Sequence, residues 1–320
     1  METVYENVKG RGARVVYPEA LEERALRAAA WLRDRDLVVP VLVGPTDQVE
    51  SKAKTLGVSL DGIDVRDPTT DPRRRDFETE YLELRKHKGM TAEKARAIVA
   101  LPHYFGALAV RAGEAVGMVS GLRSETKPFL PAFEIIKMAE GYRRVSSVFI
   151  MTWPDKVYLY ADCSVNIAPD AWMLADIGRA TAASARVFGF EPRVAFLSFS
   201  TRDSAEDASI DRVKEAVALL RKAEPDLLVD GEMQFDAAVV RDVARKKSPD
   251  SPLEGRANVF IFPDINAGNI TYKITERLGG AAAIVPVLQG LRMPVNDVSR
   301  ACSVQDLADV ATITALQSMG

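Results

Sequence analysis

Hydrophobic and polar residues alternate along the chain in two patterns. Short runs rich in β-branched residues, such as "ARVVYPE" (residues 13–19) and "VVPVLVG" (38–44), are typical of buried strands. Between them, "LEERALRAAAWLRDRD" (21–36) places its apolar residues at helical spacing. Strands that alternate with helices in this way predict a parallel sheet with helices on both faces.

The alternation continues through the middle of the chain and restarts near residue 143. "VSSVFIMT" (145–152) and "RVAFLSFST" (193–201) predict strands. "DAWMLADIGRATAASARVFG" (170–189) predicts a long helix that ends at a glycine. Because 320 residues are typical of two domains, we expect an α/β fold with two doubly wound parallel-sheet domains. The first is predicted to contain residues 1–142 plus 298–320, and the second residues 143–297.

Composition places the chain among ordinary globular proteins, with 47% hydrophobic and 27% charged residues. A net charge of −3 provides no general basic field, which argues against nucleic acid as the main partner but leaves room for local basic pockets. Cys163 and Cys302 form no disulfide or zinc pattern, and His87 and His103 could not supply a multi-histidine metal site alone. Without an apolar signal segment or an apolar run of about 18 residues, a soluble cytoplasmic protein is expected, with no membrane partner.

The usual nucleotide and hydrolase motifs do not occur in the sequence. There is no GxxxxGK[ST] loop, no GxGxxG between a strand and a helix, no GxSxG and no HExxH. A nucleotide-like ligand would therefore need another arrangement.

Polar loops follow six of the expected strands. In open parallel sheets ligands bind at the carboxyl ends of strands, so these loops suggest a shared site. Any one loop could equally be polar because it meets water. The loops are "SGLRSETKP" (120–128), "ADCSVN" (161–166), "SFSTRDSAED" (198–207), "VDGEMQFD" (229–236), "PDINAGN" (263–269) and "PVNDVSR" (294–300).

Two of these loops combine hydroxyl and guanidinium groups. "STRD" places Ser200, Thr201 and Arg202 just after a strand, and Ser299 and Arg300 form a second such pair. Because arginine can bind phosphate oxygens in a fork, two pairs in one cleft would suit a phosphoryl group.

The "PDINAGN" loop is a further candidate for anion binding. Asn266, Gly268 and Asn269 suit tight turns before a helix N-terminus, where backbone N–H groups can hold an anion.

Asp306 allows two interpretations. Ser303-x-x-Asp306 matches a helix capping box, which is a purely structural role. The N-terminus of a helix also favours a negative charge, so an ionised Asp306 could accept a proton from a thiol, a hydroxyl or water. The pattern alone leaves both roles open, and the two are compatible.

Longer stretches of the chain resemble the phosphate acetyltransferase (phosphotransacetylase) family. They include "YLELRKHKGMT" (81–91), "YLYADCSVNIAPDA" (158–171), "DLLVDGEMQFDAA" (226–238) and most of residues 258–317. The resemblance implies two α/β domains with the active site in the cleft between them, usually in a homodimer. It further implies that acetyl-CoA and phosphate are converted to acetyl phosphate and CoA, with no metal or redox cofactor.

The resemblance also implies roles for individual residues. Ser299 and Arg300 match the pair that binds phosphate and the acetyl carbonyl, and Asp306 matches the base for the CoA thiol. Arg85 matches an arginine implicated in substrate binding, and the "PDINAGN" loop matches the phosphate side of the site.

Three positions depart from the family pattern. Ala301 replaces a common glycine, Leu130 stands where an arginine is expected, and Asp203 makes the "STRD" loop acidic. Arg123 or Lys127 could supply the charge missing at Leu130. These departures keep two alternatives open: a weak or inactive acetyl-CoA-sensing domain, and a phosphate butyryltransferase.

Overall fold

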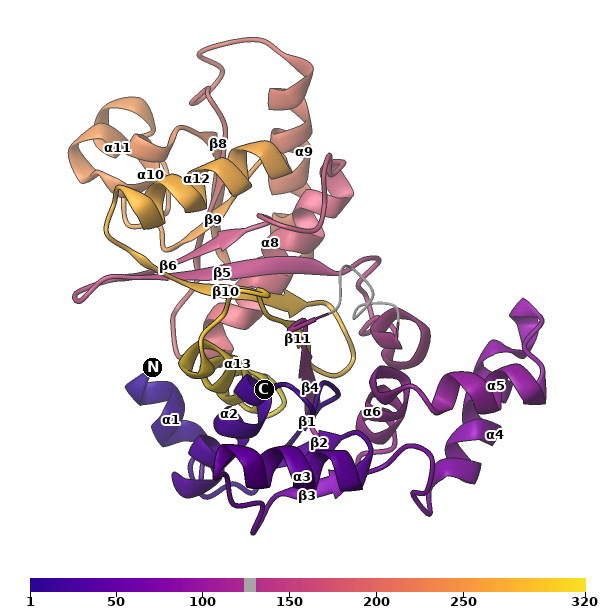
Figure 1. The fold of residues 1–320 in the computed structure, drawn as a ribbon. Helices are drawn as coiled ribbons and strands as arrows, with labels where there is room; N and C mark the ends of the chain where they lie inside the picture. Colours follow the sequence, from indigo (N-terminus) through magenta and orange to yellow (C-terminus); the bar gives the residue numbers. More distant parts are fainter. Residues whose placement is uncertain (124–130) are drawn as a thin grey trace. The chain divides into compact units, whose positions relative to one another are not determined.

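The computed structural model describes residues 1–123 and 131–320, and the side chain of Val285 is outside this description. The chain divides into two compact units. The first contains Met1–Glu140 and Leu291–Gly320, and the second contains Gly141–Gly290. Both are α/β units, as the sequence predicted, and most of their elements are labelled in Figure 1.

The first unit contains a parallel sheet with the strand order β11-β4-β1-β2-β3. Its strands are β1 (Arg14–Tyr17), β2 (Val39–Val43), β3 (Asp64–Arg66), β4 (Gly117–Ser120) and β11 (Val295–Asp297). The chain returns to this unit already at Leu291, because β11 pairs with β4. The sequence placed residues 291–297 in the second domain, whereas the structure places them in the first unit.

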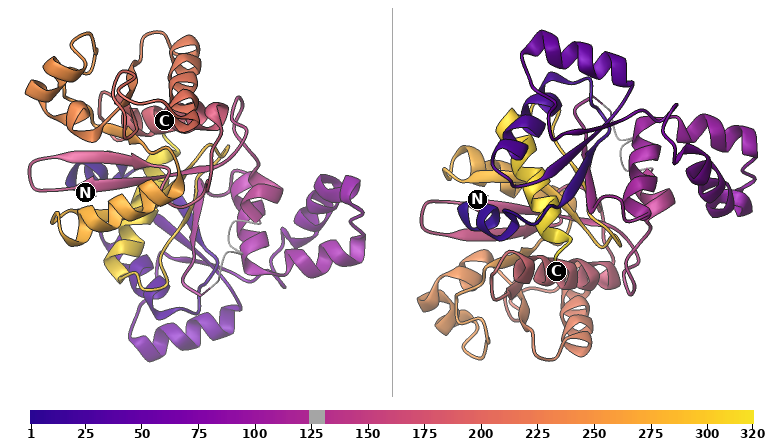
Figure 2. Two further views of the ribbon diagram at one scale, coloured as in Figure 1. Left: turned by 90° about the horizontal axis from the view of Figure 1, so that it is seen from above. Right: turned by 90° about the horizontal axis from the view of Figure 1, so that it is seen from below.

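Helices cover both faces of the first sheet. They are α1 (Glu2–Val8), α2 (Glu23–Asp34), α3 (Thr46–Leu56), α4 (Arg74–Arg85), α5 (Ala92–Val99), α6 (Pro102–Arg111) and α13 (Val304–Gln317), with the short turns η1 (Lys86–Lys88) and η2 (Ala132–Ile136). Val16 and Met118 pack in the core that contains α6. Val295 of β11 belongs to the same core. The next residue, Asn296, donates to Thr314 of α13 at 2.8 Å. Since neighbouring residues of a strand face opposite ways, α6 and α13 lie on opposite faces. Helix α13 packs beside α2, as the views in Figure 2 show.

The second unit contains a sheet with the strand order β10-β5-β6-β9-β7-β8. Its strands are β5 (Ser146–Thr152), β6 (Val157–Ala161), β7 (Arg193–Leu197), β8 (Leu228–Met233), β9 (Val259–Ile261) and β10 (Ala282–Gln289). The expected parallel pairing holds for β6, β9, β7 and β8, whereas β10 and β6 both run antiparallel to β5. Residues 153–156 join β5 to β6, and so short a connection permits a hairpin but not a parallel crossover.

Helices pack on both faces of the second sheet as well. They are α8 (Ala171–Val187), α9 (Ala208–Ala223), α10 (Phe235–Val239), α11 (Arg241–Lys247) and α12 (Ile265–Arg277). Gln289 of β10 donates to Thr181 of α8 at 2.8 Å and to Ser146 of β5 at 3.0 Å. Phe149, on the opposite face of β5, stacks on Tyr272 of α12 with ring centroids 4.2 Å apart.

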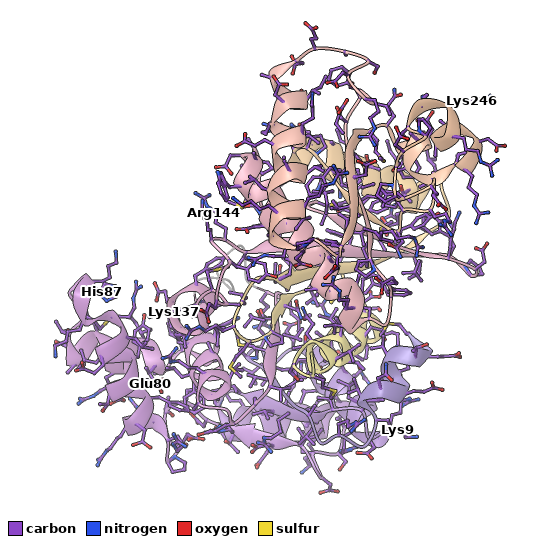
Figure 3. All side chains as sticks on the ribbon, turned by 180° about the vertical axis from the view of Figure 1, so that it is seen from behind. Lys9, Glu80, His87, Lys137, Arg144 and Lys246 are labelled. Carbon is purple, nitrogen blue, oxygen red and sulfur yellow. The ribbon has the colours of Figure 1, made fainter. Side chains whose placement is uncertain are left out.

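The surfaces of both units carry charged side chains. His87 and Lys9 of the first unit and Lys246 of the second are exposed and project from their ribbons in Figure 3. Within the described residues, no helix is long and apolar enough to cross a membrane.

A glycine sets the fit of α8 against its neighbours. A Cβ on Gly178 would lie 2.6 Å from the Phe196 ring and 2.9 Å from Leu220. We predict that Gly178→Ala lowers the melting temperature, because overpacking typically costs about 1–3 kcal/mol. The gain in helix propensity offsets at most about 1 kcal/mol of this. Gly44→Ala is the matched control, since its Cβ would only touch that of Ala20 at 3.4 Å. A Gly178→Ala protein that melts at or above the wild-type temperature contradicts the prediction.

Candidate active site

The segment after β11 forms a tight turn and then begins a helix. The Ser299 carbonyl accepts the N–H of Cys302 at 2.9 Å, and the Ser299 hydroxyl accepts that of Ala301 at 3.2 Å. Ser303 then caps α13: its hydroxyl accepts the N–H of Asp306 at 3.0 Å, and the Asp306 carboxylate accepts the N–H of Ser303 at 2.8 Å. The predicted capping box is therefore present. The side chains of Ser299, Arg300 and Asp306 are all exposed.

Arg24 of α2 ties this turn to the loop after β4. Its guanidinium donates to the carbonyls of Arg300 at 2.7 Å and Cys302 at 3.0 Å. A longer contact of 3.5 Å reaches the carbonyl of Leu122. One side chain thus joins the backbone at Arg300 and Cys302 to the backbone at Leu122. Cys302 is 6% exposed, and burial raises the pKa of its thiol, as expected for a packed cysteine.

Glu19 binds the loop after β4 from the end of β1. Its carboxylate accepts the consecutive N–H groups of Gly121 at 2.8 Å, Leu122 at 2.7 Å and Arg123 at 2.8 Å. Successive N–H groups that converge in this way form an anion-binding concavity. In this protein an internal carboxylate fills that concavity.

A second carboxyl, that of Asp297, lies against the same loop. Asp297 is the last residue of β11, where its Cα is the register partner of Ser120 in β4. A Cβ on Gly121, whose φ is +112°, would lie 2.0 Å from Asp297 Oδ1. Burial first, and then the negative charge of Glu19, raise the pKa of Asp297 to about 7.

Several buried polar atoms lack a hydrogen-bond partner at this edge of the first sheet. Among the described residues they include Asp297 Oδ1, Ser120 Oγ and His103 Nε2. Burial lowers the pKa of His103, and Glu19 partly opposes this shift. A cavity of about 260 Å³ lies beside this edge and is lined by Glu19, His103 and Arg123, among others.

The other predicted residues of the first unit lie in ion pairs. Arg85 binds Glu134 at 2.9 Å, and Tyr81 donates to the same carboxylate at 2.6 Å. Arg123 pairs with Glu22 through its guanidinium. Lys127 and Leu130 lie outside the described residues.

The "STRD" loop of the second unit is tied inward. Ser200 is fully buried, and its hydroxyl donates to Glu232 at 2.9 Å. The hydroxyl of Thr201 accepts the N–H of Gln234 at 2.9 Å. Arg202 binds Asp230 at 2.6 Å. The hydroxyls and the guanidinium are thus all engaged within the unit.

Asp203 of the same loop has a left-handed backbone with a φ of 61°. This conformation explains why a glycine suits the position, although aspartate tolerates it better than most residues. The Asp203 carboxylate pairs with Lys214, which balances its charge.

The prediction that Asn266, Gly268 and Asn269 form turns before a helix is wrong. Helix α12 already begins at Ile265, because Asp264 caps it by accepting the N–H of Ala267 at 3.0 Å. Gly268 allows close packing, since a Cβ there would lie 2.4 Å from the carbonyl oxygen of Asp162. Asn269 donates to the carbonyl of Cys163 at 3.0 Å, and Asn266 is exposed.

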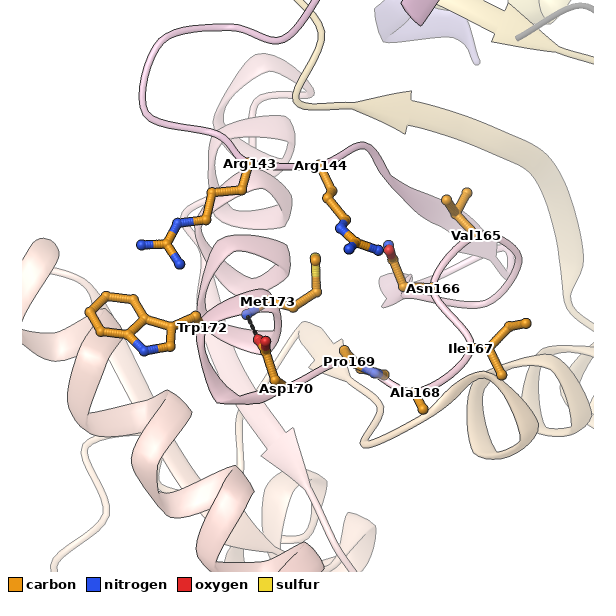
Figure 4. Close-up of a pocket in the computed structure, with 10 residues that line it drawn as sticks. All are labelled: Arg143, Arg144, Val165, Asn166, Ile167, Ala168, Pro169, Asp170, Trp172 and Met173. Atoms are coloured by element: carbon orange, nitrogen blue, oxygen red, sulfur yellow. Dashed lines mark hydrogen bonds between the residues drawn. The ribbon is translucent and has the colours of Figure 1, made fainter. Parts of the chain in front are cut away.

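A cavity of about 520 Å³ lies within the second unit (Figure 4). Arg143 and Arg144, Trp172 and the loop of residues 165–170 line it. Buried Asp162 holds this loop by accepting the N–H groups of Ser164, Val165 and Asn166 at 3.0–3.1 Å. None of the residues predicted for the active site lines this cavity.

Comparison with known proteins identifies the family. A family model described as "Phosphate acetyl/butaryl transferase" matches residues 1–315. A phosphate acetyltransferase of Bacillus subtilis is 45% identical over 318 residues, which cover 99% of this chain and 98% of that protein. The chain belongs to the phosphate acetyl/butaryl transferase family. Another relative, the phosphate acetyltransferase of Nitratidesulfovibrio vulgaris, is 45% identical, but its match covers 98% of this chain and only 45% of that longer protein.

Solved structures agree with this family. The chain is similar to the EutD phosphotransacetylase from Staphylococcus aureus with a TM-score of 0.96 and 41% identity, over 99% of this chain and 97% of that one. The resemblance drawn from the sequence is confirmed. The roles of individual residues stay predictions.

Sequence reasoning did not single out Glu19 or the role of Asp297. A usable signal was present, because "VVYPE" and "PVND" each place an acidic residue directly at a strand end. Whether two such carboxylates lie close together depends on the order of the strands in the sheet, which these local patterns do not give.

Asp297 should make the stability of the protein depend on pH. Its pKa of about 7 in the fold lies above the usual aspartate value, so the native state binds more protons than the unfolded chain between about pH 4 and 7. Its contribution to stability is therefore present at low pH and is lost as the pH rises through about 7. We predict that Asp297→Asn raises the melting temperature by several degrees at pH 8 and much less at pH 4.5.

Asp71→Asn is the control with the opposite sign. Burial alone would raise the pKa of Asp71, but the hydrogen bonds and charge of Arg66 lower it. This variant should therefore be destabilised at neutral pH and approach the wild type in acid. Thermal unfolding measures both variants. If Asp297→Asn changed the melting temperature equally at pH 8 and pH 4.5, the raised pKa assigned to Asp297 would be refuted.

Proposed function

We propose that the protein is a phosphate acetyltransferase, which interconverts acetyl-CoA and phosphate with acetyl phosphate and CoA. The observation that carries this proposal is the 45% identity to a phosphate acetyltransferase along essentially the whole chain. Ser299, Arg300 and Asp306 support it, since all three are exposed at the carboxyl edge of the first sheet. The sequence identity and the presence of these three residues favour an active acetyltransferase over a sensor domain or a phosphate butyryltransferase.

The reaction requires a thiolate and a stabilised oxyanion. A thiol with a pKa near 8.5 is mostly protonated at neutral pH, so a carboxylate that accepts its proton generates the nucleophile. In the direction of acetyl-CoA synthesis, the CoA sulfur bonds to the carbonyl carbon of acetyl phosphate. The bond between this carbon and the oxygen that links it to phosphorus breaks, and phosphate leaves. With both substrates bound together, no covalent enzyme intermediate is needed.

Asp306 can cap the helix and accept the proton at the same time. Oδ2 accepts the N–H of Ser303 at 2.8 Å. Among the described residues, no other hydrogen bond or ion pair engages the exposed carboxylate, so Oδ1 is available to a thiol. The cap then fixes the orientation of the base, and we assign Arg300 and Ser299 to the carbonyl oxygen and the phosphate.

The other predicted substrate contacts remain part of this proposal. They are Arg85, Arg123 and Lys127 of the first unit and Ser200, Thr201, Arg202, Asn266, Gly268 and Asn269 of the second. For Ser200 and Thr201 to bind phosphate, their hydroxyls would have to exchange their present partners, Glu232 and Gln234. We expect these two residues to contribute less to phosphate binding than Arg300 does.

A homodimer that binds acetyl-CoA and phosphate without a metal or redox cofactor, and a cytoplasmic location, complete the proposal. Ile270 and Ile274 of α12 and its C-cap Leu278 are 56%, 53% and 84% exposed at four-residue spacing, which offers an apolar stripe for a second copy. Sedimentation of the protein at micromolar concentration distinguishes the dimer from a monomer.

The proposed activity predicts phosphate-dependent release of CoA from acetyl-CoA. A panel of acetyl-, propionyl- and butyryl-CoA, assayed for free thiol with and without phosphate, measures both activity and acyl preference. We expect the highest kcat/KM with acetyl-CoA. Tight acetyl-CoA binding by calorimetry without turnover of any acyl-CoA would support a sensor instead.

Replacing Asp306 separates its two roles. Asp306→Asn keeps an oxygen that accepts the N–H of Ser303 but removes the base, so we predict a loss of about 10²–10⁴ in kcat with little change in stability. Ser303→Ala is the matched control, because it removes one capping bond at a cost of about 1 kcal/mol and should retain most turnover. An Asp306→Asn enzyme that is destabilised but fully active would leave capping as the only role.

A further inference from the structure

We propose that Glu19 and Asp297 are positioning residues for the acyl transfer: Glu19 fixes the loop after β4 through its amide N–H groups, and Asp297 separates that loop from the Ser299–Arg300 turn. This inference rests on the proposed function of the same edge of the first sheet. Neither residue is assigned contact with substrate.

Glu19 can hold the loop because both of its oxygens are used. One oxygen accepts from Gly121 and Leu122 and the other from Arg123, all within 2.7–2.8 Å. Bonds from several N–H groups to one carboxylate are strong because the acceptor is charged. A glutamine would keep one acceptor oxygen and turn an NH₂ group towards at least one of these N–H groups.

The carboxyl of Asp297 packs directly against Gly121 of the loop after β4. Gly121 must lack a side chain, since a Cβ there would lie 2.0 Å from Asp297 Oδ1 and 2.6 Å from the carbonyl oxygen of Val298. The N–H of Val298 donates to the carbonyl of Ser120 at 2.9 Å, which continues the pairing of β11 with β4. Ser299 follows directly, so a shift of Asp297 against Gly121 would also shift the catalytic turn.

Titratable and charged groups lie on the segments that neighbour Asp297. The β1–α2 segment supplies Glu19, Glu22 and Arg24; α6 supplies His103; the loop after β4 supplies Arg123; and the segment that follows β11 supplies Arg300, Cys302 and Asp306. Of these, the Glu19 charge acts on Asp297 itself and raises its pKa. Ionisation of Asp297 therefore places a second negative charge beside the carboxylate that holds the loop, and this repulsion loosens the support.

The first test uses Glu19→Gln in the full-length enzyme. We expect kcat to fall by roughly tenfold or more while the KM for acetyl-CoA changes less than about threefold, as for a group that orients rather than binds. Amide hydrogen exchange at Gly121–Arg123 should accelerate in this variant. An unchanged kcat, or unchanged exchange at these amides, overturns the role of Glu19.

Glu114→Gln is the matched control. Glu114 forms ion pairs with Arg66 and Arg73. It lies just before the start of β4, whereas Glu19 contacts the loop after the end of β4. Its replacement should lower the melting temperature without changing kcat or the exchange at residues 121–123. A Glu114→Gln enzyme that loses kcat to the same extent as Glu19→Gln would reduce the Glu19 effect to general destabilisation and overturn the proposal.

The second test compares Asp297→Asn with the wild type across pH. Asparagine resembles the neutral carboxyl in shape, so the ratio of variant kcat to wild-type kcat isolates the ionisation of Asp297. We expect a ratio near one below pH 6 that rises by roughly tenfold with a midpoint near pH 7. A ratio that does not change with pH overturns the role of Asp297.

Failure of the proposed function would be recognised separately. If the wild type released no CoA from any acyl-CoA, the acyl transfer would be wrong and the positioning role would fall with it. Faster exchange at residues 121–123 in Glu19→Gln would then still establish Glu19 as the structural support of the loop. Turnover by the wild type with neither variant effect would overturn only the present inference.

Discussion

The parallel pairing of β11 with β4 is the constraint on which the candidate site depends. β11 lies far along the chain from β4, and its register places Asp297 beside Ser120. The loop after β4 and the turn at Ser299–Arg300 therefore leave the sheet at the same edge, in the same direction. Without this pairing, the capping box of α13 would be an ordinary helix start with no relation to residues 121–123.

The electrostatics of this edge suit a phosphorylated substrate in spite of its carboxylates. Three amide N–H groups bind the carboxylate of Glu19, Glu22 pairs with Arg123 and Arg24, and burial favours the neutral form of Asp297. These carboxyls therefore act on the protein rather than on an incoming anion. Arg300 and Asp306 are both exposed on the segment that follows β11.

The second unit satisfies its polar loops internally. Ser200, Thr201 and Arg202 bind Glu232, Gln234 and Asp230, so the polar groups of the "STRD" loop have partners within the unit. Asp203 stands in a left-handed conformation, with Lys214 compensating its charge. The negative charge of Asp203, which departs from the family pattern, is thus compensated within the same unit.

The sequence by itself determined the local elements and the family. Helical spacing and glycine or aspartate caps are local properties, so α2, α8 and the capping box at Ser303–Asp306 could be read directly. The long matching stretches predicted the family, and comparison confirmed it. Only the tertiary structure decided which strand ends meet, because pairing between distant strands depends on the packing of whole sheets. The antiparallel β10-β5-β6 side, the carboxylate of Glu19 on three amides and the burial of Asp297 all follow from that packing.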